Sequence, residues 1–151
     1  MDRGYIERNE ASRARLQELL DRLTDDDLGR RVGEWTVAMS LAHLAFWDRF
    51  SHLRWIETVS SGRAVPVAVG SPLTDLINDT SLDVWARSLD VAGIRAFVLE
   101  AAEAFDAHVA ALPDHLVEAA QAADLPRTLD RSIHRAGHLD PIEAALPATG
   151  S

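Results

Sequence analysis

The chain has 151 residues, of which 47% are hydrophobic and 26% are charged. This is enough for one compact domain with a hydrophobic core, and we expect a single domain over residues 1–151. Cysteine and lysine are both absent, so the chain has no disulfide, no thiolate metal site and no cysteine nucleophile. The net charge of -9 argues against nucleic acid and anionic membranes as partners and favours small molecules or other proteins.

The first expected helix covers residues 5–23. Its second half carries leucines at helical spacing, namely Leu16, Leu19, Leu20 and Leu23. Its first half places Asn9 and Ser12 on the same stripe, which is more polar than an ordinary core face. We therefore expect this half of the helix to border a cavity.

The second expected helix runs from Val37 to Ser60, with Thr36 as its N-cap. Glycine and proline then interrupt the helical pattern over residues 61–72, where Val65 to Val69 are expected to form a brief extended segment. A connection of this length is typical of a crossover between helices rather than a tight turn.

Helical periodicity resumes at residues 73–81 and continues as a heptad pattern that predicts one helix packed in a bundle. The residues of this seam are Val84, Val91, Ile94, Val98, Ala101, Phe105 and Leu112. Pro113 ends the helix, a short amphipathic segment follows over residues 114–123, and a last helix is expected from Arg127 to Leu146. Together the elements predict an all-α protein, a four-helix bundle.

No apolar run approaches the roughly 20 residues that a membrane-spanning helix requires. The opening residues Met1 to Tyr5 also have no apolar stretch behind them, so a signal peptide is not expected. We therefore predict a cytoplasmic protein.

Two histidines of the last helix, His134 and His138, are four residues apart, so both imidazoles lie on one face and can share a metal ion. His43 lies on the most apolar face of the second helix, whose other members are Met39, Phe46, Trp47 and Phe50. Alone, such a histidine is more often a core residue bonded to a carbonyl. If it faces the last helix, three imidazoles converge, and three protein ligands with one open position are typical of a catalytic divalent-metal site.

The other three histidines receive simpler interpretations. His108 occupies the heptad seam, where it is expected to be a buried, hydrogen-bonded histidine, although a fourth ligand is the alternative. His52 is expected on the opposite side of its helix from His43, and His115 in a connection, so both are interpreted as surface residues.

Three segments of the chain resemble the DinB-like superfamily of small bacterial helical bundles. They are EWTVAMSLAHLAFWDRF, INDTSLDVW and LDRSIHRAGHLDPIEAAL. Within that superfamily the chain is similar to the mycothiol-dependent maleylpyruvate isomerase N-terminal type, over about residues 5–146. The resemblance implies an up-down-down-up bundle with a long crossover between the second and third helices. It also implies a divalent metal, zinc or nickel, bound by His43, His134 and His138.

The resemblance further implies a reaction that uses a thiol. A low-molecular-weight thiol such as mycothiol would lose its proton at the open metal position and attack an electrophilic small molecule, giving S-transfer or isomerisation. Since the chain has no cysteine, the sulfur must come from this cosubstrate. The all-arginine cation set suggests a GC-rich genome, which is compatible with a mycothiol-using cell. The expected helix faces and the family resemblance together give six candidate substrate-binding residues: Asn9, Ser12, Trp47, Asn78, Arg131 and Arg135.

Two other functions fit the same sequence. The first is a non-catalytic metal-binding stress or regulatory module, in which the metal serves folding. The second is a metal-free helical adaptor that forms a homodimer through an exposed helix face. This function requires the three histidines to lie far apart.

Overall fold

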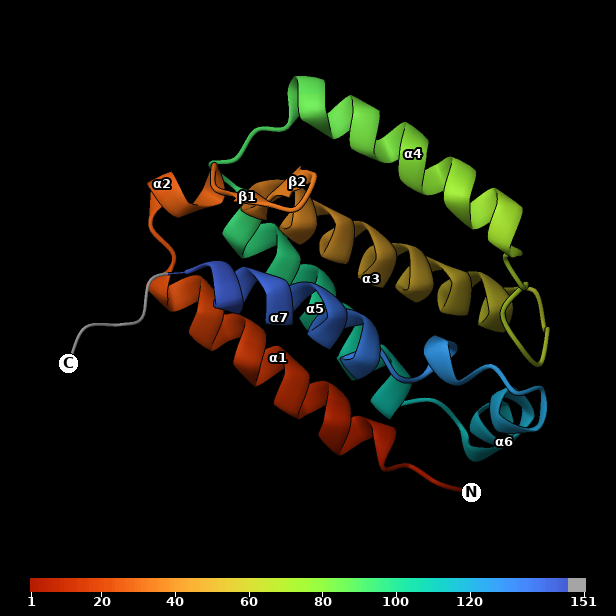
Figure 1. Ribbon diagram of the computed structural model, residues 1–151. Helices are drawn as coiled ribbons and strands as arrows, with labels where there is room; N and C mark the ends of the chain where they lie inside the picture. Colours follow the sequence, from red (N-terminus) through yellow and green to blue (C-terminus); the bar gives the residue numbers. More distant parts are fainter. Residues whose placement is uncertain (147–151) are drawn as a thin grey trace.

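The computed structural model describes residues 1–146, which fold into helices with one small hairpin (Figure 1). The protein is therefore all-α, as the sequence predicts. The elements are α1 (Tyr5–Arg22), α2 (Asp25–Leu28), β1 (Arg31–Val32), β2 (Trp35–Thr36), α3 (Val37–Ser60), α4 (Ser71–Ser88), α5 (Ile94–Ala110), α6 (Asp114–Ala122), the 3₁₀ turn η1 (Pro126–Thr128) and α7 (Ser132–Ala145). None of the described helices is both long and apolar enough to cross a membrane.

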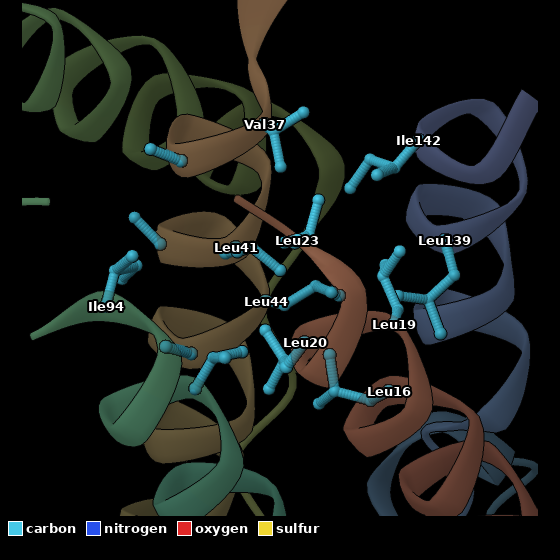
Figure 2. Packing of buried hydrophobic residues seen from close by; sticks show 14 of the residues in the cluster. Leu16, Leu19, Leu20, Leu23, Val37, Leu41, Leu44, Ile94, Leu139 and Ile142 are labelled. Carbon is cyan, nitrogen blue, oxygen red and sulfur yellow. The ribbon is translucent and has the colours of Figure 1, made fainter. Parts of the chain in front are cut away.

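Four helices, α1, α3, α5 and α7, form the bundle. In Figure 1, α1 and α7 run from right to left, whereas α3 and α5 run from left to right, so the chain passes through the bundle up, down, down and up. Figure 2 shows how leucines of α1 meet apolar residues of α3 and α7 in one core cluster. Burying such large aliphatic side chains supplies most of the driving force for packing the bundle.

A second apolar cluster lies at the end of the bundle where α6 and η1 pack. It consists of Tyr5, Trp55, Phe105, Val109, Leu112, Leu116, Val117, Ala120 and Leu129. Its polar atoms have partners, because the indole of Trp55 donates to the Thr128 carbonyl (2.6 Å) and the Tyr5 hydroxyl donates to the Val109 carbonyl (3.1 Å). The Trp55 bond ties η1, which leads into α7, to α3, and the Tyr5 bond ties α1 to α5.

The third bundle helix is shorter than the heptad pattern predicts, and the prediction of one helix through Val84 and Val91 is wrong. The helix is interrupted between Leu89 and Gly93, and Val84 and Val91 are 51% and 45% exposed. The Asp90 carboxylate accepts a hydrogen bond from the Ala92 backbone N–H, a local turn that competes with helix continuation. The seam is buried only from Ile94 onward, in α5 and at Leu112 just beyond it, while α4 has no buried residue and lies outside the core within the crossover.

The hairpin of β1 and β2 is not predicted from the sequence, and the extended strand expected at Val65 to Val69 does not form. Gly33 supplies the positive φ (63°) that the turn between the two strands requires. At the end of β2, the Thr36 side chain accepts from the Met39 N–H and caps α3, as expected. The hairpin therefore holds Trp35 beside the first turns of α3.

The last helix begins at Ser132, later than the predicted Arg127. Pro126 to Thr128 form a 3₁₀ turn instead, and the Asp130 carboxylate accepts from the Ser132 N–H (2.9 Å) at the start of α7. Leu146 is its C-cap.

Candidate metal centre

The three histidines singled out by the sequence meet between α3 and α7. His43 comes from α3, and His134 and His138 come from successive turns of α7. Their ligand nitrogens all lie within 4.8 Å of one another, and His43 Nε2 is 3.3 Å from His134 Nε2. Two nitrogens bound at 2.0–2.1 Å to one tetrahedral ion are about 3.4 Å apart, so the donor set fits a divalent metal. The separation that a metal-free adaptor requires is not found.

Burial keeps these imidazoles neutral. His43 is 4% exposed, and burial, the neighbouring His138 and the charge of Arg131 lower its pKa to about 4. Burial and, after it, the charge of Arg131 lower the pKa values of His134 and His138. Neutral imidazole is the form that binds a metal, so the lowered pKa values favour metal binding over protonation of the rings at neutral pH.

Trp35 of the hairpin packs against two of the three rings. Its indole stacks on His138 with ring centroids 5.6 Å apart and planes within 12°, and it contacts His43 at 5.0 Å. An aromatic wall of this kind restricts ring rotation and excludes water from one side of the centre.

A buried charge network lies directly beneath the histidines. Asp48 of α3 accepts from Arg131 Nε (2.8 Å) and Arg135 Nε (2.9 Å), and Arg135 makes a bidentate pair with Asp106 of α5. All four side chains are at most 6% exposed. Bidentate arginine–carboxylate pairs have a fixed geometry, so the network sets the positions of α3, α5 and α7 relative to one another.

Arg131 connects this network to the metal centre. Its Nη2 donates to His134 Nδ1 at 2.6 Å, while its Nε is held by Asp48. A ring nitrogen that accepts from a guanidinium carries no proton, so in this arrangement the single proton of the neutral His134 ring is on Nε2 and points toward His43. Because a metal binds only an unprotonated nitrogen, this proton must leave Nε2 when an ion binds there. Arg131 therefore fixes the orientation of one candidate ligand, and metal binding at that ligand is coupled to loss or transfer of a proton.

A cavity of about 680 Å³ opens from the histidines. Trp35, Trp47 and Asn78 line it, and the Trp47 indole donates to the Asn78 side-chain oxygen (2.9 Å), linking α3 to α4. Arg131 also lines the cavity. Volumes of this order are typical of small-molecule sites.

The structure places the other three candidate substrate-binding residues elsewhere. Arg135 is fully buried, and its guanidinium is engaged by Asp48, Asp106 and the Ser12 hydroxyl (3.2 Å). Asn9 donates to the Leu129 carbonyl and accepts from the Arg131 N–H. The polar half of α1 therefore borders the charge network and not the cavity.

Two histidines depart from their expected surroundings. His108 is not the hydrogen-bonded core residue predicted, because its buried Nε2 has no hydrogen-bond partner within residues 1–146. His52 is half-buried rather than on the surface, and its ring lies 5.0 Å from that of His108. His115 is exposed, as expected.

Sequence reasoning missed the carboxylates of the network and the tryptophan of the hairpin. Asp106 follows Phe105 of the heptad seam, and Asp48 lies beside Trp47 on a largely apolar helix. A carboxylate next to buried positions signals a buried partner, and arginine is the only cation in this chain that could supply one.

Comparison with known proteins gives one result that covers most of the chain. A family model described as the DinB superfamily matches residues 8–141. Neither the curated proteins nor the solved structures contain a significant match to this chain. The matched range contains most of α1, the hairpin, the crossover and all three histidines of the candidate centre, and on this basis the chain belongs to the DinB superfamily.

Proposed function

We propose that the protein is a metal-dependent thiol transferase or isomerase acting on a small electrophilic molecule. The observation that carries the proposal is the group of three neutral histidines at the wall of a 680 Å³ cavity. Three protein ligands leave a coordination position for a further ligand, which is typical of catalytic rather than structural sites.

The chain's own residues hold and orient the ligands. Trp35 fixes the His138 ring by stacking, and Asp48 orients Arg131, which contacts His134. A divalent ion bound there, zinc or nickel, would lower the pKa of a coordinated thiol and so make its sulfur nucleophilic at neutral pH. Since the chain has no cysteine, that sulfur belongs to a cosubstrate, for which mycothiol is our candidate.

The alternative function is a non-catalytic module whose metal serves folding. Two apolar clusters and the arginine–aspartate network already hold the bundle together without the histidines. This observation favours a preformed site over one that folds only with metal.

The deciding experiment measures metal, structure and reaction on the same untagged protein. We expect about one zinc or nickel ion per chain, removal of the ion by chelator with most of the helical circular dichroism retained, and mycothiol-dependent conversion of one of a panel of electrophiles, with net consumption of the thiol for S-transfer and none for isomerisation. Loss of helicity on chelation would support the folding role instead. Protein that binds neither metal would contradict both functions.

A further inference from the structure

The wall of the histidine cavity carries an excess of positive charge. Arg54, Arg127 and Arg131 line it, and Asp124 is the only carboxylate among the described residues that do so. The chain as a whole has the opposite balance, with 24 acidic residues and 15 arginines. Positive charge is therefore concentrated where the rest of the surface is acidic, and such a cavity attracts anions.

Two of these three arginines differ from most arginines of the chain, because no carboxylate pairs with them in the described residues. Most arginines lie within 4 Å of a carboxylate in the described part of the chain. The arginines without such a carboxylate in residues 1–146 are Arg31, Arg49, Arg54 and Arg127. Two of them, Arg54 and Arg127, line the histidine cavity.

Arg54 is the better defined of the two. One of its Nη atoms donates to the Val67 carbonyl of the crossover, and its guanidinium lies over the Phe50 ring at 5.7 Å. Its Nε is buried and has no hydrogen-bond partner in the described residues. Burial and the nearby charge of Arg131 lower the pKa of Arg54, as happens when a cation has no compensating anion.

Arg131, unlike Arg54, has a carboxylate partner, because Asp48 accepts from its Nε and His134 accepts from its Nη2. Arg127 is exposed on η1 at the cavity wall, and its charge acts on His134. Arg54 and Arg127 are therefore the two arginines at the cavity wall that have no carboxylate partner in residues 1–146, and a guanidinium group suits a carboxylate ligand.

We infer that the small molecule bound in this cavity carries a carboxylate, which Arg54 and Arg127 hold while another part of the molecule faces the three histidines. The inference rests on the proposed function for the histidine end of the cavity and names the chemical class of its ligand. The arginines are positioning residues that select acids over neutral analogues.

The test compares two thiols of equal chain length, 3-mercaptopropionate and 3-mercapto-1-propanol, titrated into the cobalt(II)-loaded protein. The thiolate-to-cobalt absorption band reports binding. Because a hydrogen bond to a charged group is worth about tenfold in affinity, we expect the acid to bind at least about tenfold more tightly than the alcohol. Arg54→Gln and Arg127→Gln should each reduce this ratio and leave the affinity of the alcohol unchanged.

Arg49→Gln is the matched control, since Arg49 likewise has no carboxylate partner in the described part of the chain but lines a separate apolar pocket with Phe46 and Phe97. It should keep the full ratio. Equal binding of the two thiols, or a ratio unaffected by both cavity variants, would overturn the inference while leaving a cobalt-binding site and the proposed function intact.

A second measurement does not need the metal. In metal-free protein labelled with nitrogen-15, propionate should shift the Nε–H resonance of Arg54 and not that of Arg49. If the protein fails to bind cobalt, the proposed function fails, and the propionate shift alone then decides whether the acid site exists.

Discussion

Adjacent faces of α7 carry two polar clusters of opposite character. His134 and His138 meet His43 at an open cavity, whereas Arg131 and Arg135 are buried among carboxylates. The histidines have few polar partners, and the arginines are nearly saturated with them. The buried arginine–aspartate network thus supports the histidines. Because the arginines are fixed by their carboxylate partners, they hold α7 in place, and α7 carries two of the three candidate metal ligands.

The largest effect, on stability, is expected from removing an arginine of the buried arginine–aspartate network. Arg135→Ala removes the shared partner of Asp48 and Asp106 and leaves buried carboxylates with less compensation. We expect a loss of about 3–5 kcal/mol in the free energy of unfolding, measured by urea denaturation. Arg87→Ala, which breaks an exposed pair with Asp83, is the control and should leave stability almost unchanged. A small effect at Arg135 would show that the network does not hold the bundle.

The next largest effect, on metal affinity, is expected at the three histidines, and the fold should remain intact. His138→Ala removes one of three ligands, and we expect metal affinity to fall at least about 100-fold, since even partners outside the ligand set cost 10–100-fold. Isothermal titration with zinc measures this, and circular dichroism checks the fold. His115→Ala, on the exposed face of α6, serves as the control. Equal affinities of the two variants would place the metal elsewhere.

The pH dependence of stability tests whether the histidines, unlike the paired arginines, are buried in their neutral form. The pKa of His43 is lowered from 6.5 to about 4, so between these values the unfolded metal-free chain binds a proton that the folded chain does not. The stabilisation is present above about pH 6.5 and is lost as the pH falls toward 4. His43→Gln should show a shallower decline over this range in thermal unfolding. Parallel curves would indicate that His43 titrates normally.

The smallest expected effect comes from the aromatic wall. Trp35→Ala removes the ring stacked on His138 and should weaken zinc binding by about 2- to 10-fold, the range that a stacking contact supplies. Trp35→Phe retains an aromatic ring there and should restore most of the affinity. If both variants bind zinc like the parent protein, the hairpin does not position the ligand.

Much of the fold could be predicted because local pattern and tertiary packing agree. Thr36 caps α3 at the position that its side chain indicates, and Pro113 lies between α5 and α6. The prediction was wrong where a pattern continued without a core to pack against. Val84 and Val91 continue the heptad spacing, but α4 lies outside the bundle, so spacing alone could not distinguish a buried seam from an exposed one.

The sequence by itself determined the helical class and the placement of His134 and His138 on one helix face, since periodicity and the i, i+4 spacing are local properties of a helix. For His43 the local pattern left a core role open, and its place as a third ligand was implied only by the family resemblance. Only the tertiary structure decided which polar residues meet. It joined Asp48 and Asp106 to Arg131 and Arg135 and, within residues 1–146, left Arg54 and Arg127 at the cavity wall without carboxylate partners. Charge pairing depends on distances between helices far apart in the chain, which no local pattern specifies.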